Sequence, residues 1–373
     1  MEWTLSFRPA TSLNFSDQRF GSCGRLQSTE NDGMVNSPCV TGTARVDLQV
    51  VLNLHWRASG TLCQRTVSGR LRRDFMFDVS CDPIVNIPIA IPFDADDRVD
   101  HDALSRNVER WLKTPATGFL VGSQTGEEWF LSEDEKLAVA RTVRQALDDQ
   151  RVLLGGIDCP SVTETLRRAE AFADAGAGLV RIRFPRGESI IKRYFEQVLA
   201  RCPVPVLLMH QSEPASFGQA GRPAASAETL AEVANMDKVF GYVTDHDLRF
   251  EARVRDLVSP EKRFWICNGS IILQGTLIGC NGTTTAFSNI WPAALHKLLK
   301  LGMEGRFDEA WPLQKQIQKI DAIMLPWLAA GVKASLQLLG FEGMRPRNPV
   351  APMPPDEVAK LETAMREANL LNG

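Results

Sequence analysis

The sequence predicts an α/β fold: a (β/α)8 TIM barrel with a C-terminal helical appendage and an irregular N-terminal extension. Short apolar, β-branched runs recur from residue 84, helical patterns with capping residues separate most of them, and no strand is evident after residue 303. Such alternation is typical of parallel βαβ units. Eight units within about 210 residues, with strands apolar on both faces, favour a closed barrel over an open sheet.

The eight predicted strands are, in order, 84–91, 118–123, 152–157, 179–184, 204–210, 239–244, 264–269 and 282–288. The segments "SEDE" (132–135) and "SVTE" (161–164) between them both match the capping box, with Ser at the N-cap and Glu three residues later. The segment "DAGAG" (174–178) indicates a helix end followed by a turn. Beyond the barrel, 307–340 and 354–371 have helical patterns.

Residues 1–80 differ from the rest of the chain. Apart from 46–56 they show no sustained helical or strand period, and all their basic residues are arginine. We expect a disordered or non-native extension, with Met76 as a possible true start. A transit peptide, which is also rich in Arg and Ser, and a small functional domain are the alternatives. The barrel is then expected over 81–303 and the helical region over 304–373.

The composition narrows the class of protein. A formal net charge of −3 without a basic or acidic block argues against nucleic acid or an anionic membrane as the main partner. No apolar run reaches the roughly 18–20 residues that a transmembrane helix needs. None of the eight cysteines forms a CxxC pair, so no zinc ribbon or redox motif is indicated. We expect a cytoplasmic protein.

Functional residues of such a barrel lie at the carboxyl ends of the strands. After the second predicted strand, "GSQTGEEWFLSEDE" resembles the Gly-Ser/Thr-x-Gly-Glu loop of the dihydrodipicolinate synthase / N-acetylneuraminate lyase family of barrel aldolases. The similarity covers residues 84–371 and is carried by the segments 87–104, 122–135, 152–180, 203–210 and 331–357.

The resemblance implies a barrel with a three-helix C-terminal region, a homotetramer, and condensation or cleavage of 2-oxo acids such as pyruvate without a bound cofactor. In the family, a lysine on the sixth strand forms a Schiff base with the keto group, and a tyrosine ending the fifth strand shuttles protons. The Gly-Glu loop holds the substrate carboxylate through backbone amides and a hydroxyl. On this sequence the loop falls on Ser123, Gln124, Thr125, Gly126 and Glu127.

The sequence departs from the family pattern at the reacting groups. The lysine position falls on Val243 and the tyrosine position on Met209. The nearest lysine, Lys238, has the opposite strand parity and lies roughly 16 Å away, towards the wrong end of the barrel. The family's carboxylate-binding arginine falls near Ser216, with Arg222 close by. Imine formation needs an amine beside the carbonyl, so the family mechanism is not expected here.

Several polar residues at the strand ends are candidates for other chemistry. The candidate catalytic residues are His210, Asp245, His246 and Glu127. A His–Asp pair could act as general acid and base near pH 7. The same groups together with Asp158 could instead ligate a divalent metal, although we assign none. In the simplest interpretation, Asp245 or Asp247 merely caps the following helix.

Two arginines in the fourth predicted strand, Arg181 and Arg183, share a parity and therefore face the same side. If they face the barrel interior, Arg183 could clamp a carboxylate or a phosphate. If they face the helices, they are structural partners of an acidic residue such as Glu164 or Glu170. The loop 123–128 is the best candidate for anion binding, because Gly126 lets backbone amides approach a ligand.

Two functions remain open. The first is a lyase that acts on a small 2-oxo or hydroxy acid, by aldol-type chemistry or dehydration, without a Schiff base. The second is a catalytically inactive family member that senses a small acid or serves as a partner subunit. In either case we expect a homo-oligomer, a dimer or a tetramer, that binds a small acid and neither nucleic acid nor membrane.

Overall fold

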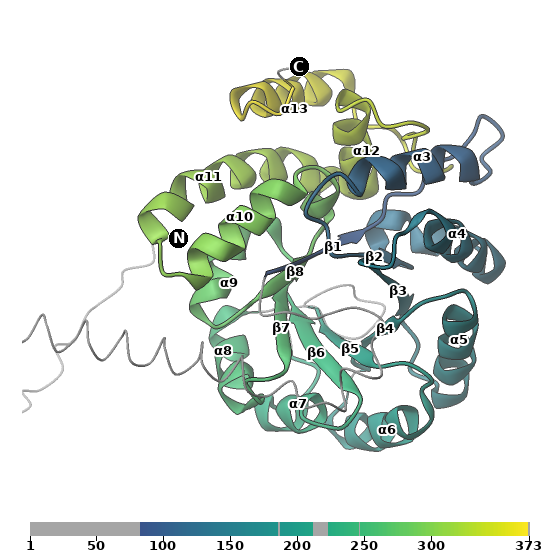
Figure 1. Ribbon diagram of the computed structural model, residues 1–373, viewed down its shortest axis with the longest axis vertical. Coiled ribbons are helices and arrows are strands. Elements are labelled where there is room, and N and C mark those ends of the chain that lie inside the picture. The colour runs from purple at the N-terminus through teal and green to yellow at the C-terminus, as the bar shows by residue number, and fades with distance from the viewer. Residues whose placement is uncertain (1–82, 186, 212–222, 246, 372–373) are drawn as a thin grey trace, which may run out of the picture. The chain divides into compact units, whose positions relative to one another are not determined.

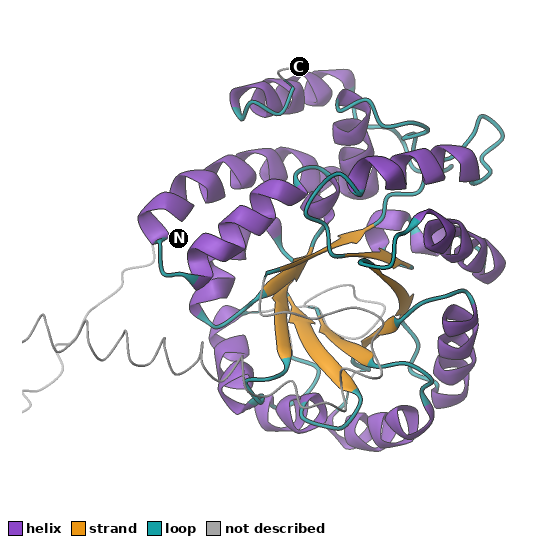
Figure 2. Ribbon diagram, in the orientation of Figure 1, coloured by secondary structure: helices purple, strands orange, loops and turns teal. Residues whose placement is uncertain are grey.

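The computed structural model describes residues 83–185, 187–211, 223–245 and 247–371, and eight parallel strands of this part close into a barrel (Figures 1 and 2). The strands are β1 Ile84–Pro88, β2 Gly118–Val121, β3 Val152–Ile157, β4 Leu179–Arg183, β5 Val206–His210, β6 Val239–Thr244, β7 Arg263–Ile266 and β8 Gly282–Thr284. The predicted (β/α)8 barrel is confirmed. The predicted extension, 1–80, lies outside the described residues.

A ring of helices surrounds the strands (Figure 2). These are α3 His101–Trp111, α4 Glu133–Ala146, α5 Val162–Asp174, α6 Glu188–Arg201, α7 Ala227–Ala234, α8 Leu248–Leu257, α9 Ile272–Leu277 and α10 Pro292–Met303. Ser132 and Glu135 form the predicted capping box at α4. Ser161 caps α5, whereas Glu164, the other half of that predicted box, pairs with Arg167.

The C-terminal region contains α11 Phe307–Met324, the 3-10 turn η6 Leu325–Trp327, α12 Leu328–Leu338 and α13 Pro355–Glu367. The segment 307–340, which has a helical pattern, therefore holds two helices separated by η6. Pro326 lacks a backbone N–H, and Leu328 adopts a positive φ of 49°, so the chain turns between α11 and α12. A side chain at Gly331 would clash with the carbonyl oxygen of Met324, which shows how closely α12 folds back on α11.

The core has two layers, and strand parity decides which side chain enters which layer. Met209 and Val243 belong to a cluster inside the barrel, together with Leu207 and Trp265. Tyr242, one residue away from Val243, belongs to the larger layer between strands and helices. Met209 and Val243, which stand where the resemblance places the family's tyrosine and lysine, therefore both face the barrel interior. Among the described helices, none combines the length and the apolar character needed to cross a bilayer.

Candidate functional site

A cavity of about 140 Å³ lies where the strands end. Its lining comes from residues near or after the carboxyl ends of seven strands, all but β3, and from the C-terminal region, which contributes Asp321 of α11 and Leu325 of η6. This is the end of the barrel where the strand-to-helix loops converge and where barrel enzymes bind their substrates. The volume suits a small metabolite better than a drug-sized ligand.

The loop after β2 reaches the cavity. Ser123, Gln124 and Thr125 line it. Ser123 caps the 3-10 turn η1 Gln124–Gly126, since the Gly126 N–H lies 3.0 Å from the Ser123 carbonyl oxygen and 3.3 Å from its Oγ. A Cβ at position 126 would come within 2.7 Å of the Ile89 carbonyl oxygen, so this close approach requires glycine.

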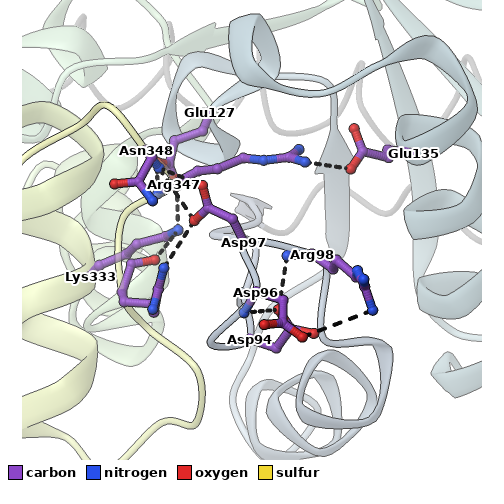
Figure 3. A network of polar contacts seen from close by, with 10 residues as sticks. Asp94, Asp96, Asp97, Arg98, Glu127, Glu135, Lys333, Arg347 and Asn348 are labelled. Carbon is purple, nitrogen blue, oxygen red and sulfur yellow. Dashed lines mark hydrogen bonds and ion pairs between the residues drawn. The ribbon is translucent and has the colours of Figure 1, made fainter.

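Glu127, one of the predicted catalytic residues, does not line the cavity and contacts the C-terminal region. Its Oε2 forms a buried ion pair with Lys333 of α12, and its Oε1 accepts a 2.9 Å hydrogen bond from the Arg347 backbone N–H (Figure 3). Lys333 also donates to the Arg345 carbonyl oxygen at 2.8 Å and lies over the Phe93 ring. Burial lowers the pKa of Lys333 to about 8, although Glu127 opposes the shift. The pair fastens the loop to the C-terminal region.

Figure 3 shows further polar contacts between the C-terminal region and the loops near Glu127. The Arg347 guanidinium donates to Glu135 of α4 at 2.8 Å, and the Asn348 backbone N–H donates to Asp97 at 3.1 Å. Arg345 also pairs with Asp97 at 3.0 Å. The segment after α12 is therefore held to the loops after β1 and β2, two loops that border the cavity end of the barrel.

Arg181 and Arg183 line the cavity, so they face the barrel interior and not the helices. Their partner is Asp158, not Glu164 or Glu170. One carboxylate oxygen of Asp158 pairs with Arg181, and the other accepts from Arg183 Nη2 at 2.9 Å. Burial alone would raise the pKa of Asp158, but the two guanidinium groups outweigh it and lower this pKa. Arg181 also donates to the Gly122 carbonyl oxygen, which anchors the start of the loop.

Glu128 completes a buried group of four charged side chains with Asp158 and the two arginines. Its carboxylate lies 3.9 Å from Arg181 Nη2. Burial, followed by repulsion from Asp158, raises the pKa of Glu128 to about 7, against the attraction of Arg181 and Arg183. A carboxyl group that titrates near neutrality beside the cavity was not predicted, since nothing in the sequence distinguishes Glu128 from its neighbour Glu127.

His210 does not line the cavity. It ends β5 with its ring between the barrel and α8, where Nδ1 lies 2.6 Å from Oε1 of the buried Glu251, and Nε2 accepts a 3.0 Å hydrogen bond from the Ala224 N–H. With Nε2 accepting, the neutral ring donates from Nδ1 to Glu251. Met209, the preceding residue, takes the inward position. His210 therefore contacts Glu251 on the helix-facing side of β5, while Asp245 alone of this predicted pair borders the cavity.

Asp245 lines the cavity directly after β6. Asp247, the alternative capping residue, caps α8 by accepting from the Arg249 backbone N–H at 2.8 Å. His246, the other predicted catalytic residue in this segment, lies outside the described residues, as do Ser216 and Arg222. Of the predicted catalytic residues that the structure describes, only Asp245 borders the cavity.

Every lysine of the chain belongs to the described part, and none of them borders the cavity. Lys238 immediately precedes β6, at its amino end, and donates to the Cys202 carbonyl oxygen at 3.1 Å. Val243 lies near the carboxyl end of β6 with its side chain fully buried inside the barrel. The nearest lysine in sequence is therefore at the wrong end of the strand to serve the cavity.

Asp321 was not among the predicted site residues. This buried residue of α11 borders the cavity and accepts a 2.8 Å hydrogen bond from Ser270 Oγ. In the helical pattern of 307–340, Asp321 is one polar residue among several. Its position at the cavity depends on how α11 packs against the barrel, which the sequence does not show. The described residues contain no group of three or more His, Cys, Asp or Glu side chains placed to hold a metal ion.

Chemically, the cavity combines two guanidinium groups on β4 with carboxyl groups after β6 and on α11. Residues 84–368 match the model of the dihydrodipicolinate synthetase family, so the chain belongs to that family. The match ends one residue after α13, and it therefore includes the C-terminal helices as well as the barrel.

Two curated relatives and one solved structure illustrate the similarity. A DapA-like lyase of Halobacterium salinarum is 27% identical over 76% of this chain and 93% of its own length. A probable mitochondrial 4-hydroxy-2-oxoglutarate aldolase of Emericella nidulans is 25% identical over 77% of this chain and 94% of its own. YagE of E. coli K12, solved in complex with pyruvate, shares the fold with a TM-score of 0.68 and 21% identity, over 77% of this chain and 99% of its own.

Proposed function

We propose that this chain is a lyase that cleaves, condenses or dehydrates a small 2-oxo or hydroxy acid without forming an imine. The observation that carries this proposal is the cavity itself, in which inward-facing arginines lie at the strand ends together with the loop 123–125, while Val243 takes the place of an amine. Membership of a lyase-containing family supports the reaction class. A cytoplasmic homo-oligomer, a dimer or a tetramer, is part of the same proposal.

In this proposal the substrate carboxylate binds between Arg183 and the loop residues Gln124 and Thr125. A guanidinium group has five N–H donors in a planar fork, so it can hold Asp158 and a ligand carboxylate at once. Asp158 fixes the orientation of Arg183 before any ligand arrives. Asp245, which borders the same cavity, takes a proton from the carbon next to the keto group of a 2-oxo acid, or from a hydroxyl group of the substrate, and returns it later in the reaction.

Two substitutions test these roles separately. Arg183→Gln is expected to weaken binding of the acid by about ten-fold or more, because a charge-assisted, bidentate contact is lost. Asp245→Asn is expected to lower kcat by roughly 100-fold with little change in KM, since it removes an acid–base group but no charge clamp. Turnover of a panel of 2-oxo and hydroxy acids, followed by mass spectrometry of the products, provides both constants.

The exposed Glu164→Gln variant is the matched control and should behave like the unmodified protein. If the Arg183→Gln variant and the Asp245→Asn variant each turned over substrate as fast as the wild type, the assigned roles would be contradicted. Binding of an acid without turnover of any member of the panel would replace the lyase by the second function, a catalytically inactive sensor or partner subunit.

A further inference from the structure

Asp321 has a buried carboxyl oxygen without a partner at the edge of the cavity. The residue is 1% exposed and borders the cavity from α11. Its Oδ2 accepts a hydrogen bond from Ser270 Oγ at 2.8 Å, whereas its buried Oδ1 has no hydrogen-bond partner within the part of the chain that the structure describes. An unsatisfied buried oxygen is unfavourable, so a ligand that brings a hydrogen-bond donor to it gains affinity.

The position of Asp321 is fixed by contacts along one face of α11. The Gln314 side chain donates to the Gly269 carbonyl oxygen at 3.0 Å, and the Gln318 side chain donates to the Ser270 carbonyl oxygen at 2.8 Å. Residues 314, 318 and 321 are spaced by about one helical turn, so they share the face that contacts the 3-10 turn η4 Gly269–Ile271. The carboxyl group is therefore held in place before a ligand binds.

Glycine at position 269 leaves room beside the carboxyl group. Gly269 also lines the cavity, and a Cβ there would lie 3.1 Å from Asp321 Oδ2 and 3.2 Å from Oδ1. Gly269 is not among the described glycines with a positive φ, so its backbone conformation alone does not require glycine. The space beside the carboxyl oxygens is what a larger residue would fill.

The free oxygen is suited to accept a hydrogen bond. An aspartate carboxyl group is ionised at pH 7 when its pKa is near the usual acidic value, and it then has acceptors only. Burial raises the pKa of Asp321, but the hydrogen bonds from the Ser270 side chain and backbone stabilise the ionised form and oppose this rise. An acceptor role requires no proton on the carboxyl group, so the donor must come from the ligand.

A hydroxyl group suits this position better than an ammonium group. The cavity already contains the guanidinium groups of Arg181 and Arg183, which would repel a further cation. Moving an ammonium group out of water also costs more free energy than moving a hydroxyl group. The Ser270 hydroxyl group, which donates to Oδ2, shows that a neutral donor satisfies this carboxyl group.

We propose that Asp321 Oδ1 accepts a hydrogen bond from a hydroxyl group of the ligand and thereby selects acids that carry a hydroxyl group away from the carboxylate. This inference rests on the proposed function and deepens it, since it adds a second point of recognition to the carboxylate clamp. In the closed order of strands, β7, which Ser270 follows, lies three positions from β4 with its arginines. The ligand then lies across the cavity, with its carboxylate at Arg183 and its hydroxyl group at Asp321.

The test compares, by calorimetry at pH 7, the binding of 3-hydroxypropionate and 4-hydroxybutyrate with that of 3-fluoropropionate and 4-fluorobutyrate. Fluorine is similar in size to a hydroxyl group but cannot donate a hydrogen bond, so each pair isolates the donor. We expect the wild type to bind at least one hydroxy acid about ten-fold more tightly than its fluoro analogue, the value of one hydrogen bond. Asp321→Leu should abolish this preference. Gly269→Ala, which keeps the carboxyl group but crowds it, should reduce the preference.

Asp308→Asn, at an exposed carboxylate on the same helix, is the matched control and should keep the wild-type preference. Equal affinity of the wild type for the hydroxy and fluoro acids would overturn the inference and leave the carboxylate clamp of the proposed function intact. A preference that survives in both Asp321→Leu and Gly269→Ala would also overturn it, as would tighter binding of 3-aminopropionate than of 3-hydroxypropionate. A wild-type protein that binds neither these acids nor pyruvate would contradict the proposed function itself and, with it, this assignment.

Discussion

Replacing Asp158 with alanine is expected to destabilise the barrel by about 3–5 kcal/mol, because it leaves two buried guanidinium groups without their shared partner. Arg181 and Arg183 are both almost fully buried, and the carboxylate of Glu128 lies farther away than that of Asp158, at 3.9 Å from Arg181. The free energy of unfolding, measured by chemical denaturation at pH 7, gives the size of the loss.

The control for this measurement is Glu164→Ala. Glu164 pairs with Arg167 on the exposed surface of α5, so its removal should leave stability close to that of the wild type. An Asp158→Ala variant as stable as Glu164→Ala would contradict the buried network. Such a result would also remove the reason for expecting Arg183 to be held in place for a ligand.

Lys333→Met is expected to cost a similar amount, about 3–5 kcal/mol, because it leaves the Glu127 carboxylate buried without a counter-ion. The methionine side chain fills the space of the lysine stem beside Phe93, so the loss reports the charge and not a cavity. Combining Lys333→Met with Glu127→Gln removes both charges and should recover most of the stability. Chemical denaturation of the two single variants and the double variant measures this coupling.

Lys319→Met is the matched control, since Lys319 and Glu367 form an ion pair on the exposed surface of the same C-terminal region. It should leave stability near the wild-type value. A double variant no more stable than Lys333→Met alone would show that Glu127 and Lys333 do not act as a pair. The loop after β2 would then need another explanation for its attachment to α12.

The fold could be predicted because its signals are local. All eight predicted strands overlap an observed strand, since buried parallel strands appear as apolar, β-branched runs of the expected length. Capping residues such as Ser132 marked helix starts in the same local way. The helical pattern over 307–340 did not locate the turn at Pro326 that separates α11 from α12.

The site was harder to predict, because knowing where a strand ends does not tell which of its last side chains points into the cavity. Met209 and His210 are adjacent, yet one enters the cavity and the other packs against Glu251, so an error of one residue in parity reverses the role. Glu127 and Glu128 differ in the same way: one is bound to Lys333 and the other lies near Arg181. Asp321 itself lies more than fifty residues beyond the end of β7, a separation in sequence that no local pattern spans.

The central claim is that the cavity binds its acid without a lysine nucleophile. The most direct measurement is borohydride trapping: the protein is incubated with pyruvate, reduced, and its intact mass is determined. We expect no adduct on the wild type, while Val243→Lys, which places an amine at the inward-facing position of β6, provides the matched comparison and should gain the mass of one reduced adduct. A wild-type adduct that forms as readily as that of a family aldolase would contradict the claim and return an imine mechanism to this chain.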